Sequence, residues 1–205
     1  IMKIDDVTLT LFKWDDIPET KYHAGAANAG GESALGLLHI RTDEGIDGFS
    51  FLGSMSFSAE VDCKGVIRTL KPLLMGQDPL DREALYQAMW KRSRITTSRS
   101  IGAVDIALYD IAAKAAGLPL YKLLGGYRTS VPAYASSAVL PSRQAYVEEA
   151  LQYKENGWAA YKIHPPTQWR EDIEICRAVR EAVGNDYDLM LDSMWSYTYD
   201  HAIKV

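Results

Sequence analysis

The chain has 205 residues, of which 47% are hydrophobic and 24% charged, with 8 Pro and 15 Gly. These proportions exclude a disordered or fibrous chain and are typical of a globular protein. The net charge of −5 argues against a nucleic-acid partner, because such a partner requires a concentrated basic patch. No apolar run is long enough to cross a membrane, and acidic residues near the start argue against a secretory signal. We therefore expect a cytoplasmic protein without a membrane partner.

The first part of the chain has the pattern of β-strands. Residues 2–12 and 34–51 alternate polar and apolar side chains with a period of two, and the second stretch is interrupted by the turn TDEGIDG. This pattern predicts an antiparallel sheet. The run between them, Asp15 to Ser33, is rich in Gly, Ala and polar residues. We predict a long loop there, which in a compact domain is usually functional or mobile.

Helical patterns follow the strands. Apolar residues recur at helical spacing over residues 59–74, 79–93 and 100–116. The last of these helices is expected to end at Gly117, with Pro119 just beyond it. Strands followed by helices predict an α+β module.

From residue 130 onward, strands and helices are expected to alternate. Strands are predicted at residues 131–139, 159–165 and 187–194, and each is followed by a helical pattern. This alternation is typical of a parallel β/α sheet or barrel, so we place one domain at residues 1–129 and a second at 130–205. A complete barrel takes about 250 residues. The barrel is therefore expected to be incomplete in this chain, as part of a longer polypeptide; the alternative is an open three-stranded sheet.

Three polar side chains fall at the ends of these predicted parallel strands. Lys162 and His164 lie two positions apart, and Asp192 follows the next strand. Strand ends of this kind face the ligand-binding loops in β/α folds. A carboxylate can bind a divalent cation, and a lysine or histidine can move a proton. On the residues alone, each has a simpler explanation. Lys162 could extend into solvent, His164 could hydrogen-bond to a loop carbonyl, and Asp192 could cap the helix that follows.

The stretch from Ile101 to Gly126, IGAVDIALYDIAAKAAGLPLYKLLGG, resembles the helix and turn that join the capping domain to the barrel in the enolase superfamily. The resemblance is to the mandelate racemase and muconate lactonizing enzyme branch. It implies an α+β capping domain followed by a (β/α)7β barrel. By resemblance, Lys162 and His164 match the Lys-x-Lys or Lys-x-His motif of the second barrel strand, and Asp192 matches the first Mg²⁺ ligand. Two further carboxylate ligands are implied on the following strands, beyond residue 205.

The resemblance implies an enzyme that uses Mg²⁺ to remove the α-proton of a small carboxylic acid. We interpret His164 as the proton carrier and Lys162 as its cationic partner, although the two roles could be exchanged. Histidine at the second motif position favours a lyase, an acid-sugar dehydratase that eliminates water to give a 2-keto acid. The alternatives are a racemase, epimerase or cycloisomerase of the same branch, and a non-catalytic fragment or fold relative. We also expect a homo-oligomer.

The predicted loop from Asp15 to Ser33 would, by the same resemblance, close over the barrel mouth. Lys21, Tyr22 and His23 offer a cation and hydrogen-bonding groups suited to a polyhydroxy acid, so we predict that they bind substrate. The alternative for each of them is a solvated loop residue.

Overall fold

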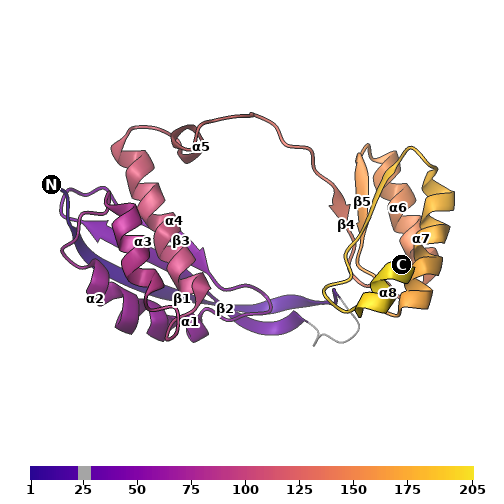
Figure 1. Cartoon of the computed structure of the whole chain (residues 1–205), viewed down its shortest axis with the longest axis horizontal. Coiled ribbons are helices and arrows are strands. Elements are labelled where there is room, and N and C mark those ends of the chain that lie inside the picture. Colours follow the sequence, from indigo (N-terminus) through magenta and orange to yellow (C-terminus); the bar gives the residue numbers. More distant parts are fainter. Residues whose placement is uncertain (23–28) are drawn as a thin grey trace. The chain divides into compact units, whose positions relative to one another are not determined.

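The computed structural model describes residues 1–22 and 29–205. Contacts between residues divide the chain into two compact units. The first unit combines Ile1–Pro18 with Gly30–Tyr127, and the second combines Glu19–Ala29 with Arg128–Val205. Each unit has its own sheet, helices and hydrophobic core (Figure 1). None of the helices in the described residues has the length and apolar character needed to cross a bilayer.

The sheet of the first unit has three strands in the order β1-β2-β3. They are β1 (Ile4–Thr20), β2 (Ala29–Thr42) and β3 (Gly48–Leu52). Strands β2 and β3 are antiparallel, with Leu38 opposite Ser50. The antiparallel pairing predicted for this segment is therefore confirmed.

The long loop predicted from Asp15 to Ser33 is wrong for most of its length. Strand β1 continues to Thr20, and β2 already begins at Ala29. Proline is tolerated in an edge strand, where its missing N–H breaks no ladder. Because β1 lies at the edge of the sheet, Pro18 does not end it. Ile17, which is 5% exposed, is buried within this extended part of the strand.

Six helical segments follow in the first unit. They are α1 (Glu60–Lys64), the π-helical η1 (Gly65–Leu70), α2 (Lys71–Leu74), α3 (Arg82–Trp90), α4 (Ser98–Ala115) and α5 (Leu120–Leu123). The first three run on without a break and cover most of the predicted helix 59–74. Helix α4 begins where the Thr97 side chain accepts a hydrogen bond from Ser100 N at 3.0 Å, as an N-cap does.

The core of the first unit lies between its sheet and α4. Val104, Leu108 and Ile111 on α4 are fully buried and pack in one cluster with residues of all three strands. Strand β3 alternates buried and exposed residues, so Phe49 and Phe51 lie on the face away from this core. The helical and strand periodicities read from the sequence thus identify the core-facing residues.

The second unit contains a parallel sheet in the order β4-β5-β6. Its elements are β4 (Ala135–Ser136), α6 (Arg143–Glu155), β5 (Ala160–Ile163), α7 (Trp169–Val183), β6 (Asp188–Leu191) and α8 (Tyr199–Lys204). The predicted alternation of strands and helices is confirmed. The first strand is much shorter than the predicted 131–139, and only Ala135 and Ser136 pair with β5. Pro132 lacks the N–H that a longer ladder would need.

Helices α6 and α7 lie side by side against the parallel sheet (Figure 1). Tyr146, Ile163 and Val179 are completely buried between these layers. Arg143 on α6 also binds Glu171 on α7 through two hydrogen bonds of 2.6 Å. This packing aligns the three strands, so their carboxyl ends meet at one edge of the sheet.

Candidate active site

The candidate site lies at the carboxyl edge of the parallel sheet. Ser137 follows β4, His164 follows β5 and Asp192 follows β6. The backbone ladder extends one step past the strands, because Ser137 N donates to Lys162 O and Asp192 N donates to Ile163 O, both at 2.9 Å. The residues after each strand are therefore held in register.

Lys162, His164 and Asp192 come together at this edge. Lys162 Nζ lies 3.2 Å from Asp192 Oδ2, and His164 Nε2 lies 3.3 Å from the same oxygen. The lysine and histidine, two positions apart on the chain, point to the same side because side chains alternate along a strand. Ile163 between them is completely buried on the other side. One carboxylate oxygen thus contacts two nitrogen-bearing groups.

The orientation of the His164 ring is fixed by backbone groups. Its Nδ1 lies 2.6 Å from the carbonyl oxygen of Ser137, and a carbonyl oxygen can only accept, so Nδ1 carries the proton. The His164 N–H donates to the Ser137 hydroxyl at 2.9 Å, and the His164 carbonyl accepts from the Tyr146 hydroxyl at 2.8 Å. Nε2 is therefore the nitrogen that can gain or lose a proton.

The electrostatics keep Lys162 and Asp192 charged. Burial lowers the pKa of Lys162, but hydrogen bonds to Asp192 and Tyr134 outweigh burial and raise it. Burial also raises the pKa of Asp192, but hydrogen bonds from Met194 N and Lys162 outweigh that effect and lower it. Lys162 is thus a stable ammonium group and Asp192 a stable carboxylate at neutral pH.

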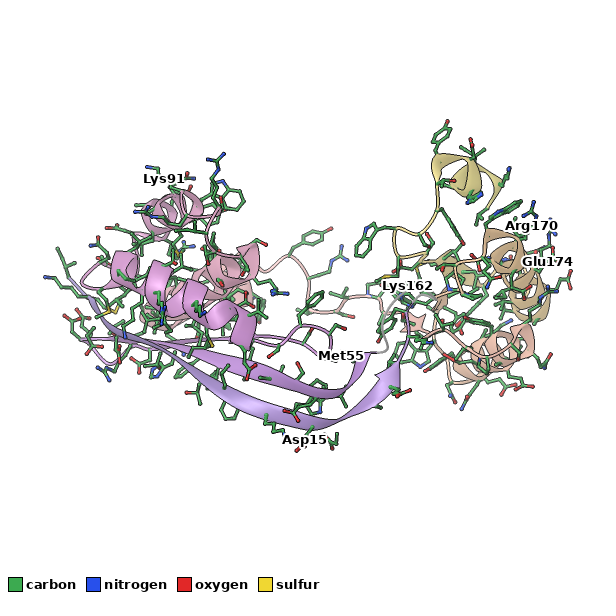
Figure 2. All side chains as sticks on the ribbon, turned by 90° about the horizontal axis from the view of Figure 1, so that it is seen from below. Asp15, Met55, Lys91, Lys162, Arg170 and Glu174 are labelled. Carbon is green, nitrogen blue, oxygen red and sulfur yellow. The ribbon has the colours of Figure 1, made fainter. Side chains whose placement is uncertain are left out.

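An open depression of about 640 Å³ borders the site. It is lined by Tyr134, Lys162, Met190, Leu191, Asp192, Ser193, Met194 and Trp195. Lys162 and Asp192 face it directly, with side chains 19% and 35% exposed. His164 is nearly buried, with a side chain 6% exposed, and is not part of the lining. Figure 2 shows Lys162 on the opposite side of this unit from Arg170 and Glu174, which lie on the outer face of α7.

The structure places two of the three predicted substrate-binding residues. The Tyr22 ring meets the His164 ring edge-on, with 4.9 Å between centroids and 65° between planes. The backbone of Lys21 accepts a hydrogen bond from Val139 N at 2.7 Å, and its side chain is exposed. His23 lies outside the described residues. Tyr22 is therefore beside the catalytic candidates, whereas the Lys21 side chain is directed to solvent.

Several residues that support the site were not predicted. Tyr134 lies just before β4, and its hydroxyl lies 3.4 Å from Lys162 Nζ. Ser137 and Tyr146 together bind both the backbone and the ring of His164. Ser137 lies inside the predicted strand 131–139, whereas β4 ends at Ser136, so the predicted strand boundary did not mark it. Tyr146 lies inside a helix, and nothing local in the sequence marks it.

The side chains that line the depression include one candidate ligand for Mg²⁺, Asp192. Among the described residues that line the depression, Asp192 is the single carboxylate, and Mg²⁺ sites commonly combine one or two protein carboxylates with water and substrate oxygens. No three His, Cys, Asp or Glu side chains lie together as a metal cluster within residues 1–22 and 29–205. The described residues therefore supply one candidate ligand and not a complete site.

Two family profiles match the chain. The profile described as "Mandelate racemase / muconate lactonizing enzyme, N-terminal domain" matches residues 10–125, and the one described as "Enolase C-terminal domain-like" matches residues 145–205. The first of these covers more than half of the chain. The protein belongs to the mandelate racemase and muconate lactonizing enzyme branch of the enolase superfamily. It has the enolase superfamily fold, with an N-terminal capping domain and a partial barrel domain.

Relatives within the enolase superfamily catalyse different reactions. L-talarate/galactarate dehydratase of Salmonella typhimurium is 33% identical over 186 residues, covering 85% of this chain and 46% of the relative. Hydrophobic dipeptide epimerase of Enterococcus faecalis is 30% identical over 171 residues, covering 82% and 48%. Other matched relatives are named as a racemase and as cycloisomerases. The chain spans about half the length of the curated relatives it matches.

A solved structure of this superfamily contains magnesium. D-glucarate dehydratase from Agrobacterium tumefaciens, complexed with magnesium, is 31% identical and superposes with a TM-score of 0.79 over 98% of this chain and 56% of the other. The capping and barrel units described above therefore have the fold of an enzyme of known chemistry. The prediction of the family from the segment Ile101 to Gly126 is confirmed.

Proposed function

We propose that the chain carries part of the active site of a Mg²⁺-dependent enzyme that removes the α-proton of a hydroxy-acid or sugar-acid carboxylate and then eliminates water. The observation that carries this proposal is the convergence of Lys162 Nζ and His164 Nε2 on Asp192 Oδ2 beside an open depression. A carboxylate, a fixed ammonium group and an imidazole are among the groups that such a reaction uses.

Each of the three residues has a distinct role in the proposal. Asp192 would be one ligand of Mg²⁺, and the bound ion would supply positive charge that stabilises negative charge developing on the substrate. Lys162 stays protonated and donates a hydrogen bond to the substrate carboxylate as negative charge develops on that carboxylate. His164 accepts the α-proton at Nε2, because Nδ1 already donates to Ser137 O.

The elimination step follows from the same imidazole. Once the C2–H proton is on Nε2, the imidazolium can protonate the leaving hydroxyl at C3 as the C3–O bond breaks. Water leaves, and the resulting enol rearranges to a 2-keto acid. The α-proton removed at C2 and the hydroxyl lost at C3 together make one water molecule, so no other reactant is needed.

Racemisation, epimerisation or cycloisomerisation is the second candidate. The matched relatives include an epimerase and cycloisomerases as well as dehydratases. These reactions also begin with loss of an α-proton, so the same three residues would serve. The product distinguishes the classes, since only dehydration gives a 2-keto acid.

The experiment is a screen with the full-length polypeptide that carries this chain. It is incubated with a library of mono- and diacid sugars and Mg²⁺ in D₂O, and 2-keto products and α-deuteration are followed by NMR. We expect a 2-keto product, lost on chelation of Mg²⁺ and in Lys162→Ala and His164→Ala. The α8 variants His201→Ala and Lys204→Ala, at residues that do not line the depression, serve as matched controls and should keep full turnover. α-Deuteration without dehydration would select the second candidate. Unchanged turnover in both site variants would refute the proposal.

A further inference from the structure

Asp172 is a completely buried carboxylate close to the candidate site. It lies in the first turn of α7, and among the ion pairs of the described residues none includes it. Burial raises the pKa of Asp172, and the hydrogen bonds that it accepts oppose this increase. A buried carboxylate without a cation is costly to keep. Its position at the start of α7 and its hydrogen bonds offset part of that cost.

The hydrogen bonds of Asp172 join two loops of the site. Its Oδ1 accepts from Gln168 N at 3.2 Å, and it also accepts from the backbone of Thr167. These residues belong to the loop that follows β5 and His164. Its Oδ2 accepts from the hydroxyl of Tyr197, which belongs to the loop that follows β6 and Asp192. One carboxylate therefore connects the loop behind His164 to the loop behind Asp192.

Both loops contain strained backbone. Thr167, Met194 and Trp195 have φ angles of 63°, 48° and 59°, in a region that residues other than glycine seldom adopt. Such a conformation is strained and persists only where its surroundings hold it. Among the described residues, these are the non-glycine residues with positive φ. All three lie in the two loops that Asp172 connects.

The turn after β6 is anchored at both ends. At its start, Asp192 N donates to Ile163 O, and Met194 N donates to Asp192 Oδ1 at 3.1 Å. At its end, Tyr197 donates to Asp172. The hydrogen bond from Met194 N reaches the same carboxylate that contacts Lys162 and His164. The direction of the Asp192 side chain therefore depends on the path of this turn.

We infer that Asp172 is a positioning residue that, through Tyr197, holds the turn after β6 so that Asp192 Oδ2 keeps its contacts with Lys162 and His164. Neither Asp172 nor Tyr197 lines the depression, so they act through Asp192 and not on the substrate. The inference rests on the proposed function for the role of Asp192 as a metal ligand. Side chains that orient a metal ligand from behind typically change metal affinity 10- to 100-fold when they are removed.

The test compares two tyrosines of the same unit in the full-length polypeptide. Tyr197→Phe removes one hydroxyl and with it the bond to Asp172. Tyr187→Phe is the matched control, because the buried Tyr187 hydroxyl has no hydrogen-bond partner among the described residues. Asp172→Asn is a second variant, which keeps the side-chain volume but leaves one acceptor oxygen for the three donors that the carboxylate accepts from. Mg²⁺ affinity is measured by calorimetry at a temperature where circular dichroism shows every variant to be folded.

We expect Tyr197→Phe and Asp172→Asn to weaken Mg²⁺ binding about tenfold or more, and Tyr187→Phe to leave it unchanged. A second measurement needs no metal. The protein is labelled with 5-fluorotryptophan and studied by fluorine NMR, and the Trp195 resonance is assigned as the one missing from Trp195→Phe. That resonance should shift or broaden in Tyr197→Phe and stay in place in Tyr187→Phe. A purely structural role for the bond would lower the unfolding temperature but leave both readouts unchanged, which would overturn the inference.

The variant Asp192→Asn distinguishes a failure of this inference from a failure of the proposed function. If Asp192→Asn abolishes Mg²⁺ binding while Tyr197→Phe and Asp172→Asn do not weaken it, the positioning role is refuted and the proposed function stands. If Asp192→Asn leaves Mg²⁺ affinity unchanged, Asp192 is not a ligand, and the metal assignment and the inference both fail.

Discussion

The Nδ1 atom of His164 lies 2.6 Å from the carbonyl oxygen of Ser137, and this contact leaves Nε2 as the proton-exchanging nitrogen of the ring. Nε2 in turn lies 3.3 Å from Asp192 Oδ2. A histidine held in this way has one defined tautomer and one defined direction for proton transfer. The catalytic roles proposed for this site depend on that arrangement.

Ser137→Ala should destabilise the protein by about 1–3 kcal/mol, because it leaves the buried N–H of His164 without its acceptor. Urea unfolding followed by circular dichroism measures the change. Ser136→Ala is the control, since the exposed Ser136 hydroxyl makes only a 3.4 Å contact with the ring, and its cost should be below about 0.5 kcal/mol. Equal stabilities for the two variants would contradict the role given to Ser137.

Tyr22→Ala should make His164 more reactive, because the ring in edge contact with the imidazole is removed. We expect severalfold faster modification of His164 by diethyl pyrocarbonate, measured by peptide mass spectrometry. Tyr22→Phe retains the ring and should react at the wild-type rate. If the alanine variant also reacts at the wild-type rate, Tyr22 does not shield the histidine.

The ion pair between Asp6 and Lys71 should make stability depend on pH. Lys71 Nζ donates to Asp6 Oδ1 at 2.5 Å, and this hydrogen bond, opposed in part by burial, lowers the pKa of Asp6 below its ordinary value of 3.8. A lowered carboxyl pKa stabilises the folded state above the unfolded pKa, and this stabilisation is lost as pH falls through the folded pKa.

Asp6→Asn should therefore lower the free energy of unfolding by about 0.5–1 kcal/mol at pH 7, and the difference from wild type should shrink as the pH falls below 3.8. Thermal unfolding over a pH series checks this. The exposed turn variant Glu44→Gln should follow the wild-type curve. A difference that stays constant down to the lowest pH would show that the ion pair is not its cause.

Gly48→Ala should destabilise the first unit, because an added Cβ would lie 2.1 Å from the carbonyl oxygen of Ala107 and 2.8 Å from Ile111. Backbone atoms of a packed helix cannot yield easily, so we expect a loss of about 1–3 kcal/mol or more. Gly102→Ala is the matched control on α4. Its Cβ meets no atom within 4 Å, and it should stabilise the helix by about 0.5–1 kcal/mol. Urea midpoints that move in the same direction would contradict this packing.

Much of the fold could be predicted from the sequence because it is locally encoded. Helix α7 runs from Trp169 to Val183, where a helical pattern is expected after the second parallel strand. The exception lies between Asp15 and Ser33, where β1 continues to Thr20 and β2 begins at Ala29 although the residues there lack an apolar alternation. Pairing between strands supplies backbone hydrogen bonds whatever the side chains are, so composition alone underestimates strand there.

The candidate site was predictable in part for a similar reason. Lys162 and His164 are separated by the strand period, and Asp192 follows the next parallel strand, so topology alone brings them to one edge. Asp172 and Tyr197 are 25 residues apart, on a helix and in an irregular turn. No period relates such positions, and only the folded loops bring their side chains together.

In the proposed mechanism His164 takes the α-proton, Lys162 stabilises the negative charge that develops, and Asp192 holds the metal. The most direct measurement is the rate of α-proton loss, followed by NMR in D₂O, for the substrate acid with Mg²⁺ and the full-length polypeptide. We expect Lys162→Ala and His164→Ala each to slow this step about 10²- to 10⁴-fold while the protein still binds Mg²⁺. Wild-type rates of α-proton loss in both variants would contradict it.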